Sequence, residues 1–290
     1  MGTINKLTER YQEALNTILF AIKIDPHYKE ALYNLGDVYK KQGDYEKAIA
    51  CFNNILSGDS GDKDAHFFLG IVLYTTGKYD LALKSFLKVV ELDSRHKKAY
   101  YNIGNIYNKQ LKYDKAISNF LQSIAIDSKY KKSHFNLGTA YFKQNIFDKA
   151  AECYAKVIEI DPNDKEAYVD LGNCLYKIKK YEEAKKYFIM AIEIDNNFKK
   201  PYYYLGMCYY KLKLFDKGII AFKKAIELDP NQKKYYYNLG ILYDEIGEID
   251  NAVKCLKKAV DFDNFYEDAK KRLESCLRKQ NNKNNQFDNY

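Results

Sequence analysis

A glycine recurs at a fixed interval of 34 residues through most of this 290-residue chain. It stands at Gly36, Gly70, Gly104, Gly138, Gly172, Gly206 and Gly240, with no insertion or deletion between them. A fixed period of about 20 to 50 residues is typical of stacked supersecondary units, and helix-turn-helix repeats have a period of about 34 residues. The sequence therefore predicts an all-α solenoid built from helix-turn-helix units.

Two other residue types follow the same period and mark its boundaries. Lysine opens seven complete units, at Lys29, Lys63, Lys97, Lys131, Lys165, Lys199 and Lys233. We number this lysine position 1, so that the glycine is position 8 and a recurring aspartate, from Asp59 to Asp263, is position 31. Apolar or aromatic residues at positions 4, 7 and 11, and again from position 17 onward, have helical spacing. We expect helix A over positions 1 to 14 and helix B over positions 17 to 30.

The rest of the chain is expected to form the two ends of one array with no internal domain boundary. Residues 1–8 are an N-terminal extension, and residues 9–28 have the pattern of a helix B that lacks its helix A. The seven units occupy residues 29–266, and residues 267–280 are expected to form a helix that caps the array. The asparagine-rich residues 281–290 are expected to be a disordered tail.

Several positions of the period match one known consensus. The fourth unit has Leu137, Gly138, Tyr141, Ala150, Tyr154 and Pro162 at the corresponding places. This pattern resembles the tetratricopeptide repeat (TPR), and Tyr33-Asn34-Leu35-Gly36 in the first unit is similar to the same consensus. The resemblance covers residues 9 to about 280 and implies a right-handed superhelix. In that family the open face of helix A lines a concave groove that holds extended peptides.

The open face of helix A consists of positions 2, 5, 6, 9, 12 and 13. The candidate peptide-binding residues on it are Asn34, Asn102, Asn105, Asn136, Asn173, Asn238, Tyr101, Phe135, Tyr203, Tyr237, Lys98, Lys132, Lys200 and Lys234. An asparagine amide can donate to one backbone group and accept from another, so a row of amides can hold a peptide of any sequence. This row resembles the asparagine ladder in the repeats of peptide O-GlcNAc transferase. Phe68, Asp170, Tyr204 and Met207 interrupt the period most visibly on this face.

The charge of the chain limits its partners. The formal net charge is +8, and nearly all of the excess is lysine, which lacks the bidentate fork of arginine. Sequence-specific reading of nucleic acid is therefore not expected, and the lysines favour an acidic peptide partner. The carboxylate clamp by which some TPR domains bind the tails of Hsp70 and Hsp90 is not expected either. Asn105 and Asn136 fit one frame of that clamp, but Tyr101, Glu166 and Asp170 contradict it.

Enzymatic chemistry is not expected, and no cofactor or metal is implied, because a repeated sequence offers no unique constellation of catalytic residues. Cys51, Cys153 and Cys255 share position 23, while Cys174 and Cys208 share position 10, so we interpret them as packing residues. The absence of a disulfide framework favours a reducing, intracellular compartment, either cytoplasmic or nuclear. The sequence contains no signal peptide and no apolar run long enough for membrane insertion.

These features lead to one main functional hypothesis and two alternatives. The main hypothesis is a non-enzymatic scaffold or adaptor that binds a partner's peptide segment in the groove. The first alternative is the substrate-recruiting region of a larger enzyme such as a protein glycosyltransferase, suggested by the missing first helix and the asparagine row. Nonspecific binding of RNA or a membrane surface through lysine is a weaker alternative, and it predicts binding that collapses with added salt.

Overall fold

The computed structural model describes residues 13, 15–264 and 266–287, with the backbone alone for residues 283–287. The repeats continue without a linker, yet the contacts within the chain divide it into two compact units, Met1–Ala140 and Tyr141–Tyr290. We describe this N-terminal unit and this C-terminal unit separately. Every regular element of the described residues is a helix, which confirms the predicted all-α class.

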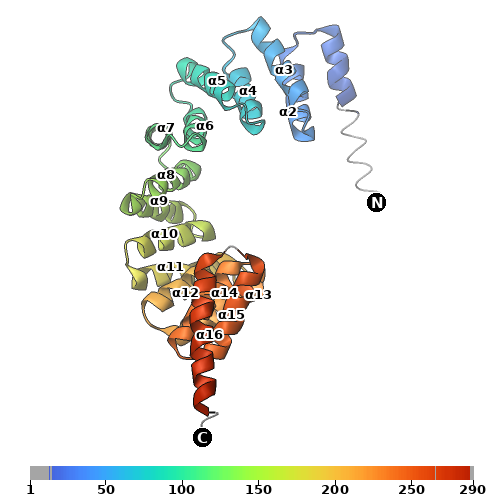
Figure 1. The fold of residues 1–290 in the computed structure, drawn as a ribbon. Coiled ribbons are helices and arrows are strands. Elements are labelled where there is room, and N and C mark those ends of the chain that lie inside the picture. The colour runs from blue at the N-terminus through green and yellow to red at the C-terminus, as the bar shows by residue number, and fades with distance from the viewer. Residues whose placement is uncertain (1–12, 14, 265, 288–290) are drawn as a thin grey trace. The chain divides into compact units, whose positions relative to one another are not determined.

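The N-terminal unit contains helix-turn-helix pairs in chain order (Figure 1). Helical residues 15–24 come first. They are followed by α2 (Lys29–Gln42), α3 (Tyr45–Gly58), α4 (Lys63–Thr75), α5 (Tyr79–Leu92), α6 (Lys97–Lys109), α7 (Tyr113–Ile126) and α8 (Lys131–Lys143), whose last residues belong to the C-terminal unit. The A helices α2, α4 and α6 each pack against the B helix that follows, and α3 and α5 also contact the next A helix.

The C-terminal unit continues the same alternation. Its helices are α9 (Phe147–Ile160), α10 (Lys165–Lys177), α11 (Tyr181–Ile194), α12 (Lys199–Lys211), α13 (Phe215–Leu228), α14 (Lys233–Glu245), α15 (Ile249–Phe262) and α16 (Glu267–Phe287). The pairs are α10 with α11, α12 with α13, and α14 with α15, and α16 packs on α15. In both units the A helices begin at position 1 and the B helices at position 17, as the periodicity predicts.

The glycine at position 8 lies against the side chain at position 24 of the partner B helix. A Cβ added to Gly104 would lie 2.6 Å from Cε1 of Phe120, and one added to Gly172 would lie 2.7 Å from Cε1 of Phe188. Both rings are fully buried. The two helices of a pair therefore approach closely at this glycine, where the aromatic ring of helix B occupies the space that a side chain would need.

The turn from helix A to helix B depends on one residue in the left-handed conformation. Position 15 has a positive φ, between 58° and 81°, in all seven pairs: Gly43, Gly77, Leu111, Asn145, Lys179, Lys213 and Gly247. A left-handed residue commonly ends an α-helix and redirects the chain. Glycine adopts this conformation without steric cost, so the four other residues hold some strain.

The aspartate at position 31 ends helix B and ties it to the start of helix A in the same repeat. Asp93 accepts the backbone N–H of Arg95 at 3.0 Å, and its other carboxylate oxygen contacts the Lys63 ammonium at 2.9 Å. Asp127 and Asp195 are bonded in the same way to a following N–H and to the lysine at position 1. This double role explains why aspartate and lysine recur with the same period.

The two ends of the array only partly match the expected boundaries. Residues 15–24 of the predicted half repeat are helical, while residues 1–8 lie outside the described residues. The cap was expected to end at residue 280 and the tail to be disordered, but α16 continues to Phe287. The buried carboxylate of Asp244 on α14 receives Arg272 and Lys279 of α16, each at 2.6 Å. These ion pairs fix the cap on the last complete helix pair.

Candidate functional site

The open faces of the A helices carry the residues that the sequence predicts to bind a peptide. Each of the two units has a hollow on these faces among its described residues. In the N-terminal unit a hollow of about 320 Å³ lies between α2 and α4, and in the C-terminal unit a hollow of about 350 Å³ lies along α10 and α12. We call them the α2–α4 hollow and the α10–α12 hollow. Both are at the small end of the range typical of ligand sites.

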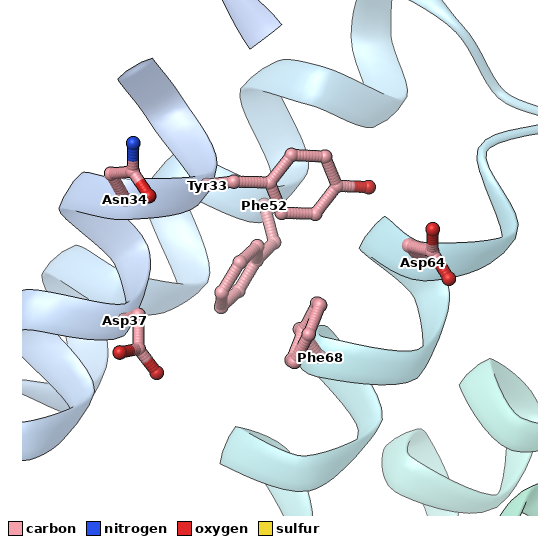
Figure 2. A pocket seen from close by; sticks show the side chains of 6 residues that line it. All are labelled: Tyr33, Asn34, Asp37, Phe52, Asp64 and Phe68. Carbon is pink, nitrogen blue, oxygen red and sulfur yellow. The ribbon is translucent and has the colours of Figure 1, made fainter. Parts of the chain in front are cut away.

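The α2–α4 hollow combines aromatic rings with carboxylates (Figure 2). Its lining is Tyr33, Asn34, Asp37, Phe52, Asp64 and Phe68. Phe52 and Phe68 are stacked, with their ring centroids 5.8 Å apart and an interplanar angle of 19°. Tyr33 meets the edge of Phe68 at 5.8 Å, and its hydroxyl donates to the carboxylate of Asp62. Burial and this carboxylate raise the pKa of Tyr33, so the hydroxyl remains a donor.

The spacing of residues along each helix builds this hollow. On α2, Tyr33 and Asp37 are four residues apart, and on α4, Asp64 and Phe68 are also four apart, so each pair shares one helix face. Phe52, from α3, completes the lining between α2 and α4, and its side chain is fully buried. Sequence reasoning singled out Asn34 and Phe68 but missed Asp37 and Asp64. The signal at position 9 was that Asp37 is its only acidic residue among the seven units. Position 2 gave no such signal for Asp64, because Glu30 and Glu166 are also acidic there.

The α10–α12 hollow has more rings, an amide and one lysine, and no carboxylate in its lining. Its lining is Phe142, Asn173, Tyr176, Lys177, Tyr203, Tyr204 and Met207. Asn173 and Tyr203 were predicted as binding residues, and Tyr204 and Met207 were noted as interruptions of the period. One helical turn before Asn173 on α10 lies Asp170, whose pKa is raised to about 6 by burial and by the nearby Glu166 carboxylate.

The predicted asparagines are not all free amides. Asn102 is 8% exposed and donates to the carbonyl oxygen of Lys98 at 2.8 Å, so it lies against its own helix. Asn238 donates to the carbonyl oxygen of Lys234 at 2.7 Å in the same way. Asn136 donates to Asn105 at 2.7 Å. Of the predicted asparagines, only Asn34 and Asn173 line one of the two hollows described above.

The predicted aromatic residues are half-buried and contribute to packing as well as to the face. Tyr101 contacts Phe120 and Tyr130, with centroid distances of 6.1 and 5.6 Å. The ring of Tyr203 lies 5.2 Å from that of Tyr235, and Tyr237 lies 5.0 Å from Tyr266. Phe135 is also half-buried on α8. The contacts of Tyr101 and Tyr237 thus lie within one repeat, and the contact between Tyr203 and Tyr235 joins two successive repeats.

The predicted lysines divide into two kinds. All four are exposed, but two of them contact a neighbouring repeat. Lys200 contacts Glu166 of the preceding repeat at 2.7 Å, and the Lys234 ammonium lies 4.7 Å from the ring centroid of Tyr203. Only Lys98 and Lys132 of the four thus extend from the surface without such a contact to a neighbouring repeat.

The reactive side chains behave as packing residues. All six cysteines are free thiols, and burial raises the pKa of Cys51 to about 11 and that of Cys153 to about 12. Thiols with such pKa values carry little of the nucleophilic thiolate at neutral pH. Within the part of the chain that the structure describes, no group of three or more His, Cys, Asp and Glu residues could hold a metal ion. None of the described helices has both the length and the apolar character that crossing a membrane requires.

Comparisons with known proteins agree with this repeat architecture. Models of the tetratricopeptide repeat match residues 8–63, 33–94, 132–164, 166–198, 200–232 and 221–254, and a TPR repeat model matches residues 104–145. No curated protein sequence matches the chain.

Three solved structures illustrate the likeness. The crystal structure of MamA is 30% identical to this chain, with a TM-score of 0.54, and the match covers 56% of this chain and 95% of MamA. The C-terminal part of a TPR repeat-containing protein from Cytophaga hutchinsonii is 19% identical, with a TM-score of 0.69 over 83% of this chain and 99% of that one. YrrB, described as a TPR protein with an unusual peptide-binding site, is 21% identical, with a TM-score of 0.56 over 64% of this chain and 96% of YrrB. At these identities the last two show the fold alone.

Proposed function

Because this chain belongs to the tetratricopeptide repeat family, we propose that it is a non-enzymatic scaffold that binds an extended segment of a partner protein on its A-helix faces. The observation that carries the proposal is the pair of hollows on these faces, each lined by aromatic rings next to polar side chains. Such a lining suits a peptide, because rings bury apolar side chains while polar groups fix the orientation of the chain.

The amides at the two hollows support a role in holding peptide backbone. Asn34 is exposed on α2 and Asn173 is half-buried on α10. Each can donate one hydrogen bond and accept another, which is what a backbone amide and carbonyl require. The fold itself is compatible with this use, since YrrB shares it and is described as having a peptide-binding site.

The proposal can be tested by selecting binders from a displayed library of random dodecapeptides with the full chain as target. We expect selected peptides to lose affinity for Asn34→Arg or for Asn173→Arg, because the larger side chain fills the hollow. Asn53→Arg is the matched control, since Asn53 is exposed on the B helix α3. Circular dichroism would check that all variants remain folded. Unchanged binding by both hollow variants would place the site away from these two hollows.

A further inference from the structure

The α2–α4 hollow is lined by two carboxylates, although the chain as a whole has a net charge of +8. Position 2 of helix A is lysine in four of the seven units and glutamate, at Glu30 and Glu166, in two others. In the second repeat this position is Asp64, which faces the hollow from α4, while Asp37 faces it from α2 (Figure 2). Two carboxylates thus stand on opposite sides of one small cavity in a basic protein.

The floor between these carboxylates is aromatic. Phe52 and Phe68 are stacked, and Tyr33 contacts both rings, at 6.2 and 5.8 Å between centroids. The face of an aromatic ring carries partial negative charge and attracts a cation within about 6 Å of its centroid. Methylene groups also pack well on such rings. The floor therefore suits a side chain that has an apolar stem and a cationic end.

The chain already places one of its own cations at this hollow. The ammonium of Lys40 lies 5.7 Å from the centroid of Phe68 and 2.6 Å from Oδ1 of Asp37. Lys41 contacts the other oxygen of Asp37 at 2.7 Å. These ammonium groups lower the pKa of Asp37, which keeps its carboxylate ionised. A cation is thus compatible with the ring face and the carboxylate together.

The carboxylate of Asp64, on the other side of the hollow, is accessible to a ligand. Asp64 is exposed, and within the described residues it makes no hydrogen bond or ion pair through its side chain. It lies one helical turn before Phe68 on α4. A guest cation could therefore contact Asp64 and the Phe68 ring at once, without first breaking the pair between Lys41 and Asp37.

We propose that the α2–α4 hollow binds the lysine or arginine side chain of a partner peptide, with the charged end between Asp64 and Phe68 and the stem against Tyr33 and Phe52. This inference rests on the proposed peptide-binding function and specifies the partner at one of its two hollows. The partner residue proposed for this hollow is basic, whereas the overall lysine content of the chain favours an acidic partner. Asp37 and Asp64 distinguish this hollow from the α10–α12 hollow, whose lining has no carboxylate and includes Lys177.

The test uses the full chain and the same displayed library of random dodecapeptides. We expect the peptides selected by the wild type to share a lysine or arginine at one position. Replacing that residue in a synthetic peptide by norleucine, which has no charge, should weaken binding about five- to tenfold, the size of a partly exposed cation contact. Fluorescence anisotropy of labelled peptides measures this change.

Two substitutions connect the preference to the hollow. Asp64→Asn should weaken binding of the lysine-containing peptide about five- to tenfold and leave binding of its norleucine analogue unchanged. The effect of the protein substitution and the effect of the peptide substitution should therefore not add, because both remove the same contact. Lys40→Gln should strengthen binding of the lysine peptide, because it removes the cation that competes for Phe68 and Asp37. Asp216→Asn is the matched control, since Asp216 is also an exposed aspartate in the first turn of its helix and lies far along the chain on α13.

Each outcome separates this inference from the function on which it rests. Selected peptides without a shared basic residue, or equal binding of the lysine peptide by the wild type and Asp64→Asn, would overturn the cationic hollow alone. In that case the proposed peptide-binding function would still stand if Asn34→Arg or Asn173→Arg abolished peptide binding. Failure of the wild type to select any peptide would overturn both.

Discussion

The glycine at position 8 shows how one residue sets the distance between two helices. A Cβ at Gly104 would lie within 2.6 Å of the Phe120 ring, which is fully buried and has little room to move. We expect Gly104→Ala to lower the free energy of unfolding by about 1 to 3 kcal/mol, because overpacking outweighs the gain of about 1 kcal/mol in helix propensity. Urea denaturation followed by circular dichroism measures the difference.

A second glycine in the same unit provides the control for this prediction. Gly58 ends α3, and a Cβ built on it would meet nothing within 4 Å. Gly58→Ala should therefore be neutral or stabilise the protein by up to about 1 kcal/mol, through helix propensity and a less flexible unfolded chain. Equal destabilisation by both substitutions would show that the Phe120 ring is not the cause.

At the scale of the elements, the turn between helices A and B stores strain in some repeats and not in others. Leu111 has a φ of 60°, whereas the equivalent Gly43 and Gly77 have φ values of 81° and 75° without a side chain to clash. We expect Leu111→Gly to raise the free energy of unfolding by about 0.5 to 1 kcal/mol. Relief of the left-handed strain, about 1 to 2 kcal/mol, exceeds the entropy that glycine adds to the unfolded chain.

The reverse change tests the same turn from the other direction. Gly43→Leu should destabilise the protein, because it places a side chain at the same left-handed position. Thermal unfolding of the two variants beside the wild type measures both effects. A loss of stability in Leu111→Gly would mean that the exposed leucine makes a contribution that outweighs the backbone strain.

At the scale of the whole molecule, the periodic features were predictable and the specific contacts were not. The 34-residue period fixes where helices begin, because each repeat packs only on its neighbours and must present the same face each time. The period also marked Phe68, Asp170, Tyr204 and Met207 as exceptions, and all of these except Asp170 line one of the two hollows. It could not show that Asn102 bonds to its own helix, since the same residue type at Asn34 is exposed.

Other contacts depend on packing between distant parts of the sequence. The cap was predicted from its apolar face, but the pair between Asp244 and Lys279 joins residues 35 positions apart and follows no repeat. Asp64 was overlooked for a different reason. An acidic residue in the first turn of a helix is ordinary, because it is stabilised by the helix dipole. Only its position beside Phe68 and opposite Asp37 gives it a role in binding.

The recurring pair between the lysine at position 1 and the aspartate at position 31 makes the stability of the array depend on pH. The lysine ammonium lowers the pKa of the aspartate in several repeats: Asp93, Asp127, Asp195 and Asp229. An acid whose pKa is lower in the folded state stabilises the fold above its unfolded pKa of about 3.9. That stabilisation is lost as the pH falls through the lower, folded value.

We therefore expect the Tm to change little between about pH 5 and pH 8, where these aspartates are ionised in both states, and to fall steadily below about pH 4. Replacing the four aspartates together by asparagine should lower the Tm at neutral pH and flatten the decrease in acid, because the amide oxygen still accepts the backbone N–H but carries no charge. Added salt should reduce the difference between the two proteins, since the pairs are partly exposed to solvent. Differential scanning fluorimetry across pH and salt measures these curves. An equally steep decrease in acid for both proteins would show that other carboxylates control the stability of the array.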